Sequence, residues 1–179
     1  IMKSGHFSTL EHVSYTFAVD GVSRALTHQL VRHRLASFNQ QSQRYVKFSD
    51  GVETVKPHTV EENEEASRVF DETIEAVIEG YQKLLDMGIP AEDARYLLPN
   101  AAETKIVITM NIRELLHFFS LRCCNRAQWE IREMAHKMLE LVRPTAPYIF
   151  MDAGAPCIRG NCPEGKMTCG NPYPKVVRD

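Results

Sequence analysis

The chain has 179 residues, of which 44% are hydrophobic and 25% charged, a composition typical of an ordinary globular protein with one hydrophobic core. Its formal net charge of −2 and isoelectric point near 6.4 disfavour a general nucleic-acid-binding protein, which would be basic. No apolar run approaches the roughly 20 residues that span a bilayer, so we expect no membrane segment. The polar first residues and the odd number of cysteines, five, favour a cytoplasmic protein.

The first part of the chain predicts a strand, a helix and a loop. Apolar residues alternate with polar or small ones over residues 13–19, which is typical of a half-buried strand, and Asp20-Gly21 is expected to end it. Helical spacing then runs from Val22 to Arg32. Residues 34–42 are polar and lack any period, so we predict a loop there, followed by a short strand near residues 44–48.

The next part predicts one long amphipathic helix. Apolar residues at helical spacing run from about Val60 to Met87, and Gly88 and Pro90 supply the stop signal. Pro90 also suits the start of a short helix, because proline is tolerated in a first helical turn.

Residues 105–110 are rich in β-formers, and two further helices should follow them. Asn111 and Asn125 are the expected N-caps, and Asn125 with Gln128 resembles a capping box. The inner face of the last helix should carry Trp129, Met134, Met138, Leu139 and Val142.

The end of the chain changes in composition. Residues 153–174 hold four of the nine glycines, four of the nine prolines and three of the five cysteines. We therefore expect one domain over residues 1–152 and an irregular Cys/Gly/Pro-rich tail over residues 153–179. Because the first residues are Ile1-Met2, we also expect natural sequence to precede them.

The strongest chemical signal is the segment Arg32-His33-Arg34, followed after seven residues by Ser42 and then by Arg44-Tyr45. Clustered cations are costly to bury without anionic partners, and arginine forks match phosphate oxygens. Neutral side chains that can hydrogen-bond a base or a sugar lie between them: Asn39, Gln40, Gln41, Ser42 and Gln43. The pattern favours a nucleotide or other anion site, with a solvated polar loop as the alternative.

This stretch resembles the R-H-R-x7-S signature of flavin-dependent thymidylate synthases. Further elements of the likeness are Gly5-His6 with Glu11-His12, Ala94-Arg95-Tyr96-Leu97-Leu98-Pro99, Asn111-Ile112-Arg113, Leu121-Arg122 and Ala127-Gln128-Trp129-Glu130-Ile131-Arg132. The likeness covers residues 5 to about 150 and implies an α+β fold, a mainly antiparallel sheet flanked by helices. It departs from the family in a shorter Gly-His element, in a shorter segment before it, and at Gln40, where some members carry Glu.

The resemblance implies a catalytic domain that binds FAD and dUMP. The residues it places at FAD are His6, Ser8, Thr9, Arg32, His33, Arg34, Asn39, Asn111, Arg113 and His117. The residues it places at dUMP are Gln29, Arg32, Gln40, Gln41, Ser42, Gln43, Arg44, Arg95 and Arg122. Arg95 would come from another subunit of a homotetramer, and Arg122 would be the catalytic residue that faces the uracil ring. Arg113 and Arg122 are nine residues apart, on roughly opposite helix faces, so they should reach different partners.

The reaction implied by the resemblance is the reductive methylation of dUMP to dTMP. Reduced flavin carries the hydride, methylenetetrahydrofolate supplies the one-carbon unit, and NADPH reduces the flavin. The protein then supplies position and electrostatics. No G-x-G-x-x-G segment is present, so a Rossmann cofactor site is not supported.

Three other interpretations of the sequence compete with this one. A nucleic-acid-binding module would use Arg32, Arg34, Arg44 and Lys47, but the low isoelectric point and the few nearby aromatic residues count against it. A cysteine-nucleophile thymidylate synthase would need an activated thiolate, whereas Cys123 and Cys124 lie in an apolar stretch. A zinc site in the tail would use Cys157, Cys162 and Cys169, but their spacing and number do not fit, so we predict no metal.

Overall fold

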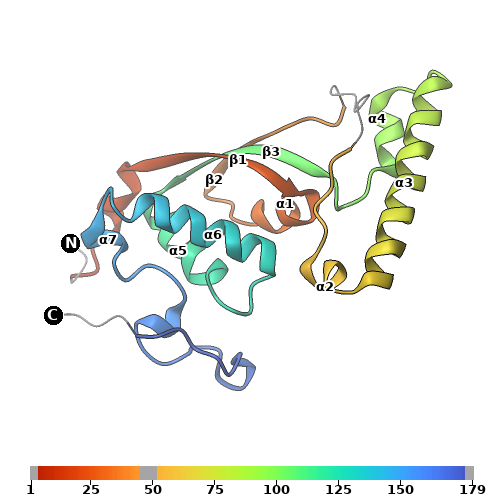
Figure 1. Ribbon diagram of the computed structural model, residues 1–179. Coiled ribbons are helices and arrows are strands. Elements are labelled where there is room, and N and C mark those ends of the chain that lie inside the picture. Colours follow the sequence, from red (N-terminus) through yellow and green to blue (C-terminus); the bar gives the residue numbers. More distant parts are fainter. Residues whose placement is uncertain (1–3, 45–51, 176–179) are drawn as a thin grey trace. The chain divides into compact units, whose positions relative to one another are not determined.

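The computed structural model describes residues 4–44 and 52–175 and confirms the α+β fold (Figure 1). Its antiparallel sheet has the strand order β1-β3-β2, with bounds β1 Ser14–Ser23, β2 Ala36–Gln40 and β3 Glu103–Asn111. The helices are α1 Arg24–Leu30, α2 His58–Glu61, α3 Glu64–Asp86, α4 Ala91–Ala94, α5 Ile112–Arg122, α6 Trp129–Val142 and α7 Pro147–Phe150. Tyr45, Lys47 and most of the strand predicted near residues 44–48 lie outside the described residues.

Strand β1 continues past the point where the sequence predicted its end. Gly21 adopts a φ of 70° inside the strand, a conformation open to glycine. Its amide donates to Asp20 Oδ1 at 2.9 Å, and the other oxygen of that carboxylate accepts from Lys105 Nζ on β3, also at 2.9 Å. Pairing with β3 therefore outweighs the local turn preference of Asp-Gly, and the predicted break was wrong.

Strand β2 lies within the segment that was predicted to be a loop. Ala36, Phe38 and Gln40 are half-buried and alternate with the exposed Ser37 and Asn39. This alternation in burial is that of a strand with one covered face. Because most of the side chains are polar, the alternation does not appear as a pattern of hydrophobic and polar residues in the sequence. The loop prediction over residues 34–42 was therefore wrong for residues 36–40.

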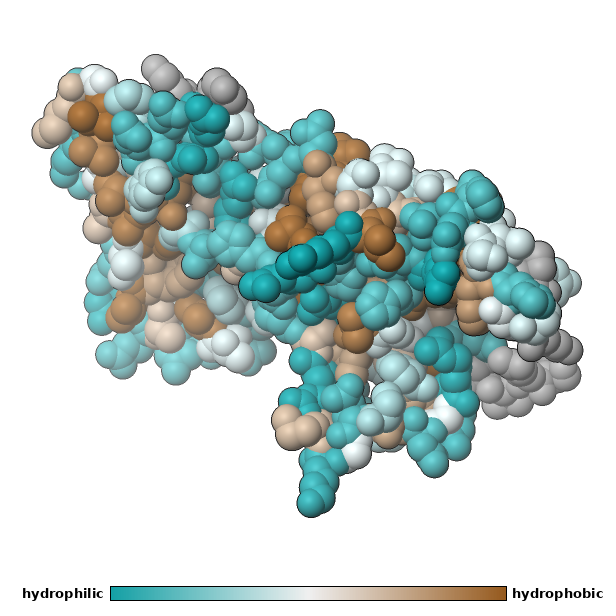
Figure 2. All heavy atoms as spheres, turned by 180° about the vertical axis from the view of Figure 1, so that it is seen from behind, coloured by the Kyte–Doolittle hydropathy of each residue, from teal (hydrophilic) through white to brown (hydrophobic). Residues whose placement is uncertain are grey.

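The long amphipathic helix is confirmed as α3, preceded by the single turn α2. Asn63 caps α3, and its side chain accepts from the Ala66 amide at 3.0 Å. Of the residues of α3, Tyr81 is buried, whereas Val69 on the apolar face remains 52% exposed. Figure 2 shows hydrophobic side chains among hydrophilic ones on the part of the surface that includes α3. Helix α4 begins directly after Pro90, as predicted.

The chain divides into two compact units, and each strand runs from one unit into the other. The first unit holds residues 4–17, 29–37 and 108–175, and α5 packs against α6 within it. Its largest fully buried side chains include Phe118, Phe119, Leu115, Ile131 and Phe150. The second unit holds residues 18–28, 38–44 and 52–107, with Leu26, Tyr81, Ala94, Ala102 and Ile106 buried.

One of the two predicted helix caps is confirmed. Asn111 caps α5, because its side chain accepts from the Glu114 amide at 2.9 Å. Asn125 does not cap α6: its side-chain amide donates instead to the carbonyl of Asn171 at 2.7 Å, a contact with the tail that local sequence cannot reveal. Gln128 caps α6, accepting from the Ile131 amide at 3.1 Å.

The inner face of α6 is as predicted for Met134, Met138, Leu139 and Val142, which are buried, while Trp129 is half-buried. The tail is irregular, with two short 3₁₀ turns at Pro156–Ile158 and Gly165–Met167. No helix in residues 4–44 and 52–175 is long and apolar enough to cross a membrane.

Candidate active site

The Arg32-His33-Arg34 segment forms the turn between α1 and β2. The His33 amide donates to the Leu30 carbonyl at 3.1 Å, and the His33 carbonyl accepts from the Ala36 amide at 3.3 Å, which fixes the turn at both ends. As a result His33 points inward and is 5% exposed, whereas Arg32 and Arg34 are both exposed. The motif thus presents two cations outward and one imidazole inward.

Both nitrogens of the buried His33 ring have protein partners. Nδ1 lies 3.1 Å from Glu114 Oε1, and Nε2 accepts a hydrogen bond from Arg122 Nε at 3.0 Å. The His33 ring packs against the Phe118 ring in a T-shaped arrangement, and the exposed His117 ring lies 6.0 Å away between centroids. Burial lowers the pKa of His33, and the Arg122 charge lowers it further, although the hydrogen bond to Glu114 acts in the opposite direction.

Arg122 ends α5 and is held at two points. Besides its bond to His33, its terminal nitrogen donates to the Gln29 carbonyl at 3.4 Å. The side chain is half-buried, and burial lowers the pKa of its guanidinium, which nevertheless stays protonated at neutral pH. Arg113, at the other end of α5, is exposed and pairs with Glu11. The two arginines therefore reach different partners, as their spacing predicts.

The other residues expected at FAD in the first unit lie at or near the N-terminus of α5. The 3₁₀ turn Phe7–His12 packs against α5, and its residues Ser8 and Thr9 are exposed. Thr9 Oγ1 donates to the carbonyl of His6, which is also exposed. Asn111 has its side-chain oxygen engaged as the cap of α5.

The remaining predicted site residues belong to the second unit, and two of them are arginines near α4. Arg44 donates through two nitrogens to Glu92 Oε2, at 3.0 and 2.7 Å, and Arg95 Nε donates to the Glu92 backbone carbonyl at 3.0 Å. The Arg24 guanidinium lies in the same unit: burial and then the Arg95 charge lower its pKa. No sequence motif marks Arg24, and only the fold brings it near Arg95.

The polar row that leads to Arg44 is partly committed to the protein itself. The Gln40 amide nitrogen donates to the hydroxyls of Thr27 at 3.2 Å and Thr104 at 3.3 Å, so it faces the interior of its unit. Asn39 is exposed on β2, and Gln43 is half-buried.

Beyond β2, the Ser42 hydroxyl accepts from the Arg44 amide at 3.2 Å. The Gln41 carbonyl accepts from the Arg24 guanidinium at 3.1 Å. These bonds hold the chain that carries Ser42 and Arg44 in a defined turn.

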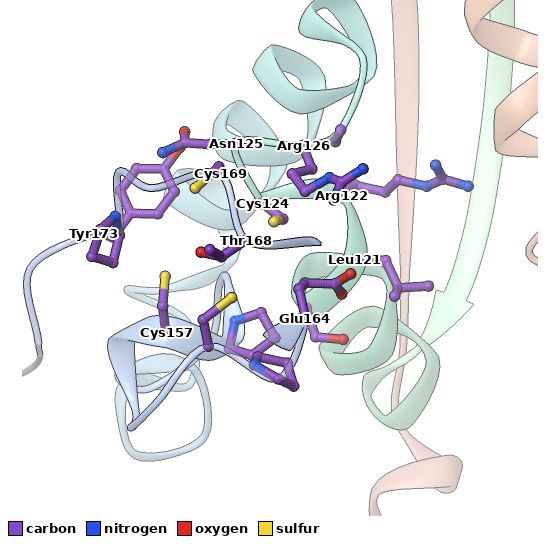
Figure 3. A pocket seen from close by; sticks show the side chains of 16 residues that line it. Leu121, Arg122, Cys124, Asn125, Arg126, Cys157, Glu164, Thr168, Cys169 and Tyr173 are labelled. Carbon is purple, nitrogen blue, oxygen red and sulfur yellow. The ribbon is translucent and has the colours of Figure 1, made fainter. Parts of the chain in front are cut away.

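A pocket of about 310 Å³ lies where the end of α5 and the following turn meet the tail, and Arg122 forms part of its wall (Figure 3). Four thiols line it: Cys124 from the turn, and Cys157, Cys162 and Cys169 from the tail. Within the described part of the chain, no three His, Cys, Asp or Glu side chains are grouped to hold a metal ion.

The fifth cysteine, Cys123, is buried, and burial raises the pKa of its thiol to about 12. A thiol with that pKa is protonated at neutral pH, which argues against Cys123 as a nucleophile.

Comparisons with known proteins agree on one family. The profile of the family described as thymidylate synthase complementing protein matches residues 1–148. The chain is 60% identical over 171 residues to a protein of Geobacter sulfurreducens, 53% over 184 residues to one of Nitratidesulfovibrio vulgaris, and 48% over 186 residues to one of Clostridium tetani. Each relative is named flavin-dependent thymidylate synthase. The alignments cover 95%, 97% and 95% of this chain, and 74% of each relative.

Proposed function

Because the chain belongs to the thymidylate synthase complementing protein family, we propose that it is a flavin-dependent thymidylate synthase that methylates dUMP reductively to dTMP. The observation that carries the proposal is the Arg32-His33-Arg34 turn. It presents two arginines to solvent and connects its histidine to Arg122, 89 residues away in sequence. A solvated polar loop would not need a buried histidine with a partner on each nitrogen.

The chemistry of the donor set in the first unit fits FAD. The cofactor carries a pyrophosphate, and the exposed Arg32, Arg34 and Arg113 are suited to anionic oxygens. Further residues are also assigned to FAD binding: His6, Ser8, Thr9, His33, Asn111 and His117 of this unit, and Asn39 of β2. When bound and reduced by NADPH, the flavin would supply the hydride, and methylenetetrahydrofolate would supply the one-carbon unit.

The substrate phosphate is assigned to Arg44 of one subunit and Arg95 of another. Within each chain both guanidinium groups donate to Glu92, Arg44 to its carboxylate and Arg95 to its backbone carbonyl, which holds them beside α4. Ser42, already fixed by the Arg44 amide, has a hydroxyl that can still donate to a phosphate oxygen. Gln29, Arg32 and the polar residues Gln40, Gln41 and Gln43 complete the dUMP set.

Arg122 is assigned to the uracil carbonyls. Its Nε and one terminal nitrogen are engaged by His33 and Gln29, which restrains the guanidinium while leaving it further N–H donors. A donor fixed before the reaction stabilises negative charge as it develops, without reorganisation at that moment. Arg122 is therefore proposed as the catalytic residue.

We assign the active form to a homotetramer with shared sites. The support is the apolar face of α3, where a groove is lined by Val69, Phe70 and Ile74 together with Pro99 and Ala101. Val69 is 52% exposed there, and burying such side chains against a second copy is favourable.

Flavin binding is the first test. The purified chain should be yellow, release FAD on denaturation, and form dTMP from dUMP when supplied with methylenetetrahydrofolate and NADPH. Arg34→Ala should lose flavin, whereas the matched control Arg68→Ala should keep it, since Arg68 is an exposed arginine of α3 that pairs with Glu72. A colourless protein that cannot be reconstituted with FAD would refute the proposed function.

A further inference from the structure

Glu114 is a buried carboxylate that the family likeness does not assign to any ligand. Glu114 lies in the first turn of α5 and is 5% exposed. Its Oε1 lies 3.1 Å from Nδ1 of His33, which is 81 residues away in sequence. Burying a carboxylate is costly unless it is hydrogen-bonded, and the first turn of a helix lowers that cost only in part. We therefore expect the buried Glu114 carboxylate to have a function at Nδ1 of His33, the nitrogen that it contacts.

The hydrogen bonds define the protonation of His33. Arg122 Nε carries a hydrogen and can only donate, so His33 Nε2 must be the acceptor. A neutral imidazole with an unprotonated Nε2 carries its proton on Nδ1, which then donates to Glu114. If the proton moved to Nε2, two N–H groups would face each other across 3.0 Å and the contact with Arg122 would break.

We propose that Glu114 is a positioning residue: it holds His33 as the Nδ1–H tautomer, and His33 in turn orients the Arg122 guanidinium. The inference rests on the proposed function only for the consequence at uracil, because the tautomer is a property of the protein alone. A carboxylate is suited to this role because it accepts hydrogen bonds and cannot donate them, whereas a neutral amide can do either.

The charges around His33 make its hydrogen bond with Arg122 depend on pH in a defined direction. The groups that face the ring are Glu114, His117 and Arg122 of α5, with Arg32 and Arg34 next to it in the chain. Burial, as the largest effect, lowers the pKa of His33, so the ring stays neutral through neutral pH. As pH falls through this lowered pKa, Nε2 gains a proton and Arg122 loses its acceptor. The ordering of Arg122 is therefore present at high pH and lost in acid.

The test is NMR of the chain labelled with ¹⁵N-histidine, with the His33 signals assigned by a His33→Gln variant. The wild type should show a protonated Nδ1 and a bare Nε2. Glu114→Gln should raise the Nε2–H fraction at least several-fold and lower turnover roughly tenfold, the scale of one lost hydrogen bond. The matched control is Glu130→Gln, since Glu130 is also a buried glutamate in the first turn of a helix, and it should change neither readout.

Two further variants separate positioning from mere support of the fold. Glu114→Asp keeps a pure acceptor, so it should restore the Nδ1–H tautomer in part, and it replaces Glu114→Gln if that variant does not fold. The double variant Glu114→Gln with Arg122→Lys should turn over no more slowly than Arg122→Lys alone, because both changes remove the same effect.

A wild-type Nε2–H tautomer, a tautomer unchanged in Glu114→Gln, or fully additive losses of turnover would each overturn the inference. If the wild type makes no dTMP, the proposed function fails, while the NMR result still decides the role of Glu114 at His33.

Discussion

Replacing Arg122 with alanine tests the proposed chemistry most directly. The side chain makes two hydrogen bonds to the protein, to His33 Nε2 at 3.0 Å and to the Gln29 carbonyl at 3.4 Å, and the second is near the limit of a useful bond. Losing one fixed donor at a developing charge typically costs about 10²–10³ in rate, or ~2.7–4 kcal/mol of barrier.

The same change has a smaller effect on stability. It leaves Nε2 of the buried His33 without its donor, which costs about 1–3 kcal/mol. A domain with a free energy of unfolding of roughly 5–15 kcal/mol survives that loss. The variant should therefore fold, retain FAD and turn over slowly.

Arg113→Ala is the control on the same helix and should give the opposite pattern. Arg113 is exposed and pairs with Glu11, and such surface ion pairs contribute about 0–1 kcal/mol, so stability should hardly change. Its proposed contact with FAD predicts a lowered flavin content instead. The assays are single-turnover dTMP formation, flavin absorbance per chain and urea unfolding of both variants.

Either of two results would refute a role for Arg122 at the uracil ring. If Arg122→Ala loses flavin in proportion to turnover, Arg122 is a cofactor ligand and not a group that acts at uracil. If the variant makes dTMP at the wild-type rate, the guanidinium contributes nothing to the transition state.

Four further outcomes are expected. Glu92→Gln should tighten dUMP binding up to about fivefold, measured by titration. The change removes the exposed ion pair with Arg44, which is worth about 0.2–1 kcal/mol, and it removes a negative charge near the phosphate. Weaker binding would contradict this prediction. Ser42→Ala should weaken dUMP binding by roughly 0.5–1.5 kcal/mol yet still make dTMP, and intact-protein mass spectrometry of the wild type should show no nucleotide adduct at Ser42. Mixing Arg44→Ala with Arg95→Ala should restore some activity if sites are shared, and no restoration despite proven subunit exchange would count against that. Metal analysis should find less than one zinc per chain, and stoichiometric zinc lost on Cys157→Ser would overturn the prediction.

The sequence by itself determined the features that depend on neighbouring residues. The amphipathic period identified α3, Asn111 was recognised as a helix cap, and β-forming residues marked β3. Residue identities also located the Arg32-His33-Arg34 segment and predicted that Arg113 and Arg122 lie on different sides of α5. These inferences are local, because helical spacing and capping involve residues only a few positions apart.

Only the tertiary structure decided features that depend on residues distant in sequence. Strand β2 exists because its polar residues pair with β3, and Asn125 is drawn away from α6 by Asn171, 46 positions later. The four thiols of one pocket come from the turn after α5 and from the tail. The link from Glu114 through His33 to Arg122 spans 81 and 89 positions, and no periodicity carries information over that distance. Only folding brings Glu114 at the start of α5 and Arg122 at its end to the imidazole ring of His33.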